Sequence, residues 1–279
     1  PADCEVIMNP YGRTLKPDEL VQLAGEAIGI IAGTEKYDAT TLSQLKNLKV
    51  ISRVGVGIDG IDLAVAKERG IKVLNTPNGP TQAVAELVLG LMLSLLRKTH
   101  LMDRELRQGN WKKEMGNLLC SKAVGIVGLG RIGRKVAELV SAFGAKVGYS
   151  EIAADASFAG ATRFSLPDLL KWADIVSLHC SAKGKLIGDA ELRTMKKGSW
   201  LVNASRGTLV DESALLRSLQ DGHLAGAALD VFEQEPYSGP LTGMSQVILV
   251  PHVGSYARES RIQMETDAVK NLLEGLRSC

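Results

Sequence analysis

The sequence predicts an α/β protein of two domains, each built on a parallel sheet flanked by helices, with a cleft between the domains. Three observations lead to this fold class. Short apolar runs of strand length alternate with helical segments along the chain. A second such series follows a long apolar helix, and a length of 279 residues suits two domains. The second series opens with a glycine-rich turn between a strand and a helix.

The first series contains four predicted strands and two predicted helices. The strands are expected at residues 6–8, 28–32, 50–52 and 72–74, and the helices at 17–27 and 63–69. Pro17 suits the start of the first helix, and Gly70 suits the end of the second. From residue 83 onward, apolar positions recur on one face of a long helix. The domain boundary is expected inside that helix.

The second series supplies the other sheet. Its strands are expected at residues 123–127, 146–149, 175–178, 200–202, 226–229 and 247–250. A final helix is predicted at 257–276, and we expect it to pack on the first domain. That domain would then comprise residues 1–94 together with 257–279, and the second domain residues 95–256.

A glycine-rich run, Gly128-Leu129-Gly130-Arg131-Ile132-Gly133, joins the first strand and the first helix of the second series. Gly128 permits a tight turn, Gly130 lets the backbone approach a pyrophosphate, and Gly133 lets the helix pack on the strand. The N-terminal end of the helix presents free N–H groups to the phosphates. The second domain is therefore predicted to be Rossmann-like and to bind a dinucleotide.

Reactive side chains follow three strands of the second series. Arg206 follows one strand, Asp230 and Glu235 follow the next, and His252 follows the last. Because the carboxyl ends of parallel strands meet at one crevice, these groups should converge there. Arg206 suits the binding of a carboxylate or carbonyl, and His252 suits proton transfer with Glu235 keeping its imidazolium charged. With a dinucleotide alongside, the predicted chemistry is hydride transfer coupled to proton transfer.

Each of these residues also has a purely structural alternative. Arg206 could pair with Asp211 on the surface, Asp230 could cap a turn, and Glu235 could be a solvated turn carboxylate. His252 is nevertheless the expected proton donor among the four histidines. The main competitor is His179, which also follows a strand and is expected to shape the cofactor pocket. The other two are expected in the long helix (His100) and in a glycine-bounded turn (His223).

The composition excludes several classes of protein. With 45% hydrophobic and 23% charged residues, the chain resembles an ordinary globular protein. The net charge of +2 provides no field that attracts nucleic acid or a membrane surface. The longest apolar stretch, 87–96, is too short to span a bilayer, and the first residues lack a signal-peptide pattern. Cys4, Cys120, Cys180 and Cys279 form no metal-binding or disulfide pattern, so we expect a metal-free cytoplasmic protein.

Several motifs together resemble one family. They are ISRVGVGIDGIDL, NTPNG, AVAEL, GIVGLGRIG, ADIVSLH, KKGSWLVNASRGTLVDESAL, GAALDVFEQEP and PHVGS. They span nearly the whole chain in one order and resemble the D-isomer-specific 2-hydroxyacid dehydrogenases, most closely the phosphoglycerate dehydrogenase branch. The resemblance implies an NAD(P)-dependent oxidoreductase that transfers a hydride between the cofactor and a small D-2-hydroxy or 2-oxo acid. It makes 3-phosphoglycerate one candidate substrate.

The resemblance also assigns site residues. The catalytic Arg, Glu and His of the family fall on Arg206, Glu235 and His252. Its cofactor contacts fall on Thr76, Arg131, Ile132, Cys180, Ala204, Ser205, Asp230, Gly254 and Ser255. The predicted cofactor site also includes Gly128, Gly130 and Gly133 of the glycine-rich run, and Ser150 at the end of the next strand. Its substrate-carboxylate loop falls on Arg53, Val54, Gly55, Val56 and Gly57, where backbone N–H groups would receive the anion. A homodimer, with residues 98–111 as a contact, is also implied.

Three departures from the family pattern stand out. Where members often have an aspartate for the adenosine ribose, this chain has Ser150 followed by Glu151. NAD is the expected cofactor because Glu151 can take over that role. NADP stays open because serine would not repel a 2′-phosphate. The proline and threonine usual after the strand-end His-x pair are replaced here, and members commonly begin with another strand and helix ahead of Cys4.

A second class of function stays open at this stage. Relatives in the corepressor branch are dinucleotide-sensing scaffolds whose cofactor binding sets their assembly state. The complete catalytic set in this chain favours an enzyme over such a scaffold.

Overall fold

The computed structural model describes residues 4–182 and 184–278, and it divides into two compact units. Unit 1 comprises Pro1–Pro80 and Ser255–Cys279, and unit 2 comprises Thr81–Gly254. The sequence-based boundary at residue 94 falls inside helix α4 (Pro80–Arg97), whereas the division of the structure lies at the start of that helix.

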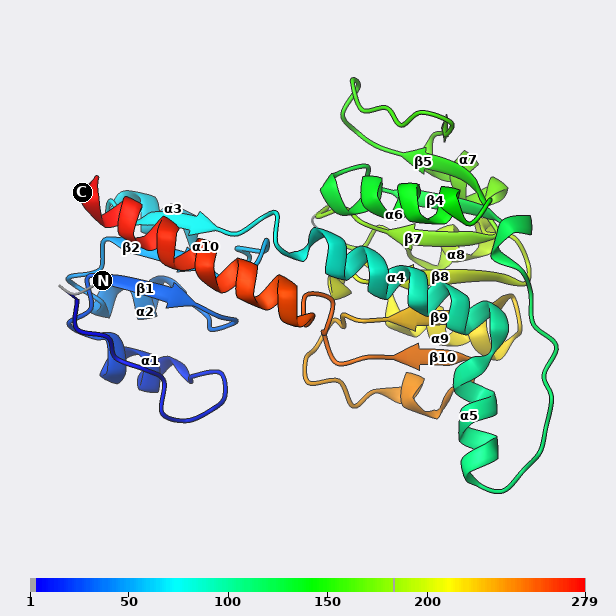
Figure 1. Cartoon of the computed structure of the whole chain (residues 1–279), viewed down its shortest axis with the longest axis horizontal. Helices are drawn as coiled ribbons and strands as arrows, with labels where there is room; N and C mark the ends of the chain where they lie inside the picture. Colours follow the sequence, from blue (N-terminus) through cyan, green and yellow to red (C-terminus); the bar gives the residue numbers. More distant parts are fainter. Residues whose placement is uncertain (1–3, 183, 279) are drawn as a thin grey trace. The chain divides into compact units, whose positions relative to one another are not determined.

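Unit 1 is built on a three-stranded parallel sheet of order β1-β2-β3. Its strands are β1 (Gly29–Ala32), β2 (Val50–Arg53) and β3 (Lys72–Asn75). Its helices are α1 (Pro17–Ala24), α2 (Ala39–Gln44), α3 (Leu63–Glu68) and α10 (Arg258–Arg277). Helix α10 lies alongside all three strands, although it comes from the far end of the chain (Figure 1). The close approach depends on small residues, since a Cβ on Gly29 would meet Leu272 at 2.8 Å and one on Gly275 would meet Val50 at 2.9 Å.

The strand expected at residues 6–8 is not formed. Val6, Ile7 and Met8 are 68%, 57% and 76% exposed, and none of them pairs with a strand of the described sheets. An apolar run becomes a strand only where a neighbouring strand accepts its backbone hydrogen bonds, and local sequence does not reveal that neighbour.

Unit 2 is built on a seven-stranded parallel sheet of order β10-β9-β8-β7-β4-β5-β6. Its strands are β4 (Ala123–Val127), β5 (Lys146–Ser150), β6 (Thr162–Arg163), β7 (Ile175–Leu178), β8 (Ser199–Asn203), β9 (Leu224–Leu229) and β10 (Val247–Leu249). Besides α4, its helices are α5 (Thr99–Arg107), α6 (Arg131–Ala142), α7 (Leu166–Trp172), α8 (Asp189–Thr194) and α9 (Glu212–Gln220). Short 3-10 turns lie at Leu119–Ser121, Gly207–Leu209 and Pro240–Gly243.

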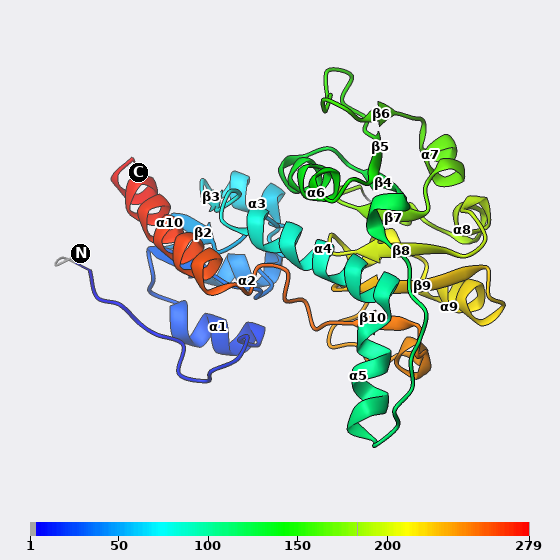
Figure 2. The same ribbon diagram turned by 45° about the vertical axis from the view of Figure 1, so that its right-hand side comes forward.

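Both faces of this sheet are covered by helices, as Figure 2 shows, with α4 and α6 on one side and α7, α8 and α9 on the other. Alternate strand residues serve the two faces: Leu201 packs into the cluster under α7–α9, and Val202 packs into the cluster under α4 and α6. Burial on both faces makes six of these strands nearly continuous apolar runs, which is why the sequence predicts them within one or two residues. The sequence analysis did not anticipate β6, because its two residues are exposed and carry no apolar pattern.

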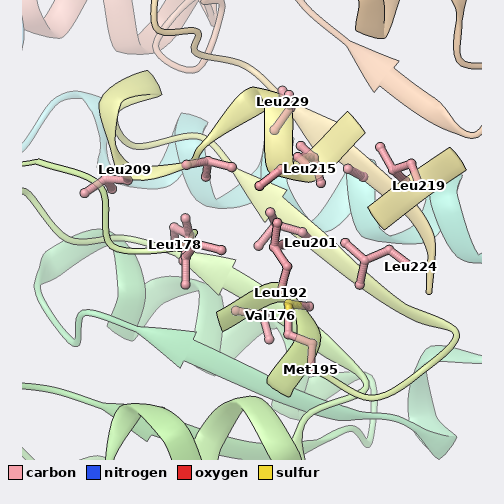
Figure 3. Packing of buried hydrophobic residues seen from close by; sticks show 14 of the residues in the cluster. Val176, Leu178, Leu192, Met195, Leu201, Leu209, Leu215, Leu219, Leu224 and Leu229 are labelled. Atoms are coloured by element: carbon pink, nitrogen blue, oxygen red, sulfur yellow. The ribbon is translucent and has the colours of Figure 1, made fainter. Parts of the chain in front are cut away.

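The core beneath α7–α9 is made of side chains from neighbouring strands and two helices. Leu178, Leu201 and Leu229 from three adjacent strands pack with Leu192 of α8 and Leu215 of α9 (Figure 3). All five side chains are at most 1% exposed. This core holds the ends of β7, β8 and β9 in one fixed layer.

Helix α4 is shorter than the sequence pattern suggested. It ends at Arg97, and Lys98 takes a left-handed conformation (φ 53°) before α5 begins. His100 therefore lies in α5, and its expected place in the long helix is wrong. By length and composition α4 could cross a membrane, but half of it is buried, as in a core helix that passes the same test.

Replacing Leu178 with Ala should lower the free energy of unfolding by about 2–5 kcal/mol, because it removes a fully buried side chain and leaves a cavity. Urea denaturation followed by circular dichroism measures this. Ile152→Ala is the control, since Ile152 is 96% exposed and should change the value by no more than about 0.5 kcal/mol. Equal losses in both variants would contradict the packing described.

Candidate active site

The glycine-rich turn after β4 has the form that a phosphate-binding turn requires. Gly128 has a φ of +95°, and a Cβ there would lie 2.7–2.8 Å from backbone atoms of His179 and Cys180. Gly133 faces the Gly128 carbonyl and has no room for a side chain. Gly130 begins α6 with no side-chain cap, and no atom lies within 4 Å of the position of its Cβ. The N-terminal end of α6 is thus open to an anion.

Glu151, the residue after β5, forms a hydrogen bond to the glycine-rich turn. One carboxylate oxygen accepts the Leu129 N–H at 2.7 Å, and the other accepts the N–H groups of Ile152 and Ala153 at 2.7 and 3.2 Å. Burial opposes ionisation, but these hydrogen bonds outweigh it and lower the pKa of Glu151. A carboxylate that stays ionised therefore lies beside the turn, next to Ser150.

Arg163 also lies here, and the sequence analysis did not anticipate it. Its guanidinium donates to the carbonyls of Glu151, Ala153 and Ala154 at 2.7–2.9 Å. These bonds commit three of its five N–H donors to the backbone after β5. The residue lies twelve positions from Glu151 in sequence, so only the tertiary fold reveals the proximity.

The loop after β8 is braced by a buried asparagine. The Asn203 amide donates to the Arg206 carbonyl at 2.9 Å and accepts the Ser205 N–H at 3.1 Å. The Ser205 hydroxyl donates to the Cys180 carbonyl, which ties this loop to the one after β7. The Arg206 guanidinium donates to the Ser205 carbonyl at 2.8 Å. Ala204, Ser205 and Arg206 are all partly buried.

Gly207 brings this loop against the loop after β9. A Cβ on Gly207 would overlap the carbonyl group of Phe232 and lie 2.6 Å from the Glu233 nitrogen. Any other residue would force the two loops apart. The segment that carries Arg206 and the segment that leads to Glu235 therefore lie in direct contact.

His252 and Glu235 form a hydrogen-bonded pair. The Nδ1 atom of His252 lies 2.8 Å from one carboxylate oxygen of Glu235, and the other oxygen accepts the Phe232 N–H at 3.1 Å. The side chains are 55% and 38% exposed, so both are accessible from solvent. Two residues seventeen positions apart in sequence thus meet as the pattern of strand ends predicted.

The loop that carries His252 has an unusual conformation held by a buried carboxylate. His252 has a φ of +53°, a region that non-glycine residues seldom adopt. Asp230, only 1% exposed, accepts the N–H groups of Val253 and Gly254 at 2.6 and 2.9 Å. Burial raises the pKa of Asp230, and these two hydrogen bonds act against that rise. Asp230 thereby fixes the backbone on which the imidazole is mounted.

The two strand-end histidines have different surroundings. The Nε2 atom of His179 lies 2.8 Å from the Ser177 hydroxyl, and its Nδ1 is buried without a hydrogen-bond partner among the described residues. Burial lowers the pKa of His179 to about 4, so this ring is neutral near pH 7. His252 is half exposed and paired with a carboxylate. Of these two rings, His252 therefore has the surroundings that proton transfer requires.

In unit 1, the loop after β2 is tied to Thr76. The Gly55 N–H donates to the Thr76 hydroxyl at 2.7 Å, and the Thr76 N–H donates back to the Gly55 carbonyl at 3.0 Å. Thr76 is 1% exposed. The structure therefore gives Thr76 a bracing role in unit 1, which the sequence analysis did not anticipate.

These bonds limit which amides of the loop can receive an anion. The Gly55 amide is used by Thr76, and the Val54 amide donates to the Ala32 carbonyl at 2.9 Å. The amides of Val56 and Gly57 have no partner among the described residues. The Arg53 guanidinium folds back onto the Val54 carbonyl. The sequence analysis treated the whole loop as a donor set, but its second half alone has that capacity.

The remaining predicted residues divide between the units. The glycine-rich turn, Ser150, Cys180 and the strand-end residues up to Gly254 lie in unit 2, whereas Arg53–Gly57, Thr76 and Ser255 lie in unit 1. Residues 4–182 and 184–278 contain no cluster of His, Cys, Asp and Glu that could hold a metal ion. Cys279 lies outside the described residues.

The chain is similar to several known proteins in sequence and fold. Residues 89–254 match the model of the "D-isomer specific 2-hydroxyacid dehydrogenase, NAD binding domain" family. The glyoxylate reductase of Aeropyrum pernix is 39% identical over 257 residues, which cover 86% of this chain and 77% of that protein. The D-3-phosphoglycerate dehydrogenase of Sus scrofa is 40% identical over 261 residues, but the chain spans only 49% of its length. A crystal structure from Thermus thermophilus matches with a TM-score of 0.90 and 38% identity, over 96% of this chain and 88% of that one.

The neutral, buried His179 predicts an acid-labile contribution to stability. An unfolded histidine titrates near 6.5 and the folded one near 4, so the unfolded state binds more protons between these values. The stabilisation is complete above pH 6.5 and falls by about 3 kcal/mol as the pH drops toward 4. Unfolding free energies measured between pH 7.5 and 4.5 should decline less steeply in His179→Gln. Parallel curves for the two proteins would refute this prediction.

Proposed function

The chain belongs to the D-isomer specific 2-hydroxyacid dehydrogenase family, and from that premise we propose that it interconverts a small D-2-hydroxy acid and its 2-oxo acid with a nicotinamide cofactor. The observation that carries the proposed mechanism is the 2.8 Å pair between His252 and Glu235, mounted next to the Arg206 loop. A proton donor, a carboxylate partner and a guanidinium are what reduction of a 2-oxo acid requires from the protein.

The glycine-rich turn fits a dinucleotide. The open backbone at Gly130 and the uncapped start of α6 offer N–H groups and space to a pyrophosphate. Arg131 and Ile132, in the first turn of that helix, and the loops at Cys180, Ser205 and Gly254 are proposed to border the cofactor. When bound, the nicotinamide ring supplies or accepts the hydride.

NAD is the proposed cofactor in preference to NADP. The ionised Glu151 beside the turn favours ribose hydroxyls and repels a 2′-phosphate. Arg163 is a cation at this backbone that could favour NADP, but three of its five N–H donors are engaged by carbonyls. Those bonds hold the guanidinium on the backbone after β5.

In the reductive direction His252 is the proposed proton donor. Its Nδ1 faces Glu235, which leaves Nε2 to carry the proton toward the substrate oxygen. Glu235 stabilises the charged ring and fixes its orientation, and the Phe232 N–H in turn fixes Glu235. Arg206 is proposed to bind and polarise the 2-oxo group.

The substrate carboxylate is proposed to bind at the amides of Val56 and Gly57, with Arg53 adding positive charge nearby. The named relatives act on glyoxylate or on 3-phosphoglycerate, so we propose these acids as the first substrates to test. The proposed partner is thus a small-molecule acid, with no nucleic acid and no membrane.

A cytoplasmic homodimer is the proposed working form. The segment 98–111, expected to be the contact, includes Leu106 and Trp111, which are 55% and 82% exposed in the single chain. Large exposed apolar side chains can be buried when a second protein covers the surface, if they lie in one patch. The complete Arg206, Glu235 and His252 set argues against a scaffold without turnover, so that alternative is not adopted.

The direct test is a screen of 2-oxo acids and 2-hydroxy acids, including glyoxylate and 3-phosphoglycerate. Each acid is assayed with NAD(H) and with NADP(H), and turnover is measured by the absorbance of the reduced nicotinamide. We expect turnover with at least one acid and a preference for NAD(H). NAD(H) binding without turnover of any acid would favour the scaffold instead.

His252→Ala should lower kcat by at least about a hundredfold, because the proton donor is lost. The affinity for NADH, measured by fluorescence titration, should change little. His223→Ala is the matched control, since this ring lies in a turn and contacts the Met195 carbonyl, and it should keep wild-type activity. A His252→Ala enzyme with near wild-type kcat would rule out the proposed role.

Glu235→Gln should lower kcat of the reductive reaction by at least about tenfold, because the carboxylate that orients the His252 ring is lost. Steady-state kinetics with an accepted 2-oxo acid measure this. Glu233→Gln removes a nearby carboxylate that pairs with Lys185 at 3.1 Å, and its kcat should match the wild type. Equal kcat values for Glu235→Gln and wild type would count against the pair.

A further inference from the structure

Unit 2 has a cavity of about 490 Å³ at the edge opposite the proposed active site. It is lined by Lys98, Met115, Asn117, Lys122, Asp174, Lys196, Lys197, Gly198, Ser199, Trp200 and Ala225. Lys122 immediately precedes β4, Asp174 immediately precedes β7, and Ser199 begins β8. The cavity therefore lies where these parallel strands start, whereas the glycine-rich turn and Arg206 follow their other ends.

Positive charge dominates the lining. Four lysines face one aspartate, and that aspartate is already engaged: Asp174 pairs with Lys196 at 2.9 Å and accepts the Ala123 N–H at 2.8 Å. Lys98 pairs with Glu114 at 3.3 Å. After these pairs are counted, Lys122 and Lys197 form no ion pair within the part of the chain that the structure describes.

An aromatic ring and a small residue complete the lining. The Lys122 ammonium lies 5.5 Å from the centre of the Trp200 ring, so one cation is held above the indole. No atom lies within 4 Å of the position of a Cβ on Gly198, which leaves space beside the lysines. The Gly198 amide donates to the His223 carbonyl at 2.7 Å, so the lysines rather than this amide would bind an anion.

We propose that this cavity binds a small organic or inorganic anion with two or more negative charges. The charges of Lys122 and Lys197 together would neutralise a dianion. Ammonium groups make charge-assisted hydrogen bonds to phosphate or carboxylate oxygens. The cavity volume falls in the range of sites for small molecules. Such a ligand would bind independently of the nicotinamide cofactor, since its residues are distinct from those around the glycine-rich turn.

Isothermal titration of the whole chain with inorganic pyrophosphate, at low ionic strength and with saturating NADH, tests the proposal. NADH blocks the start of α6, where pyrophosphate could otherwise bind. We expect one site per chain, with affinity reduced at least tenfold in the double variant Lys122→Gln and Lys197→Gln. The matched control, Lys67→Gln with Lys270→Gln, removes the same charge from unit 1 and should bind as the wild type.

Three results would overturn the proposal: no binding in the presence of NADH, unchanged affinity in the cavity variant, or equal weakening in the control. Thermal unfolding shows whether the double variant folds. If it does not, Lys197→Gln alone serves, because this lysine is exposed and makes no described ion pair. It should still weaken pyrophosphate binding several-fold, and wild-type affinity in this single variant would also reject the site.

Discussion

The buried carboxylate of Asp230 is the constraint on which the proposed chemistry depends. It follows β9, and its two hydrogen bonds hold the backbone just after His252, which follows β10. The left-handed conformation of His252 costs about 1–3 kcal/mol, and the charge-assisted bonds to Asp230 offset that cost. Asp230, at the end of β9, holds the backbone after His252 in place, and the imidazole thus reaches Glu235. The geometry of the proposed site therefore depends on two neighbouring strands of the sheet rather than on one loop.

Most of the architecture of unit 2 could be predicted because its sheet is covered on both faces. A strand buried on both sides is a continuous apolar run, and the polar residue that ends it marks the edge where function collects. That rule predicts Arg206, Asp230 and His252 as site residues. The short helices α7 and α8 span only seven and six residues, too few for a clear helical period.

The sequence could not reveal contacts between residues that are distant along the chain. It also could not reveal where a single residue with an unusual backbone conformation ends a helix. The hydroxyl of Thr76 is committed to Gly55, which removes one amide from the anion-binding loop, and no local pattern shows this. Arg163 reaches the backbone after β5 only through the fold. The left-handed Lys98 divides what the apolar pattern presents as one helix, because periodicity does not report the conformation of a single residue.

Glu151 links two properties that protein engineers usually treat as separate. Its carboxylate supplies negative charge beside the turn and also clamps the Leu129 amide within it. Replacing Glu151 with a residue that has no acceptor oxygen would release that amide and loosen the phosphate cradle itself. In this chain, redesign of coenzyme choice has to remove the charge and keep an acceptor for Leu129, and a glutamine has one carbonyl oxygen for both this amide and those of Ile152 and Ala153.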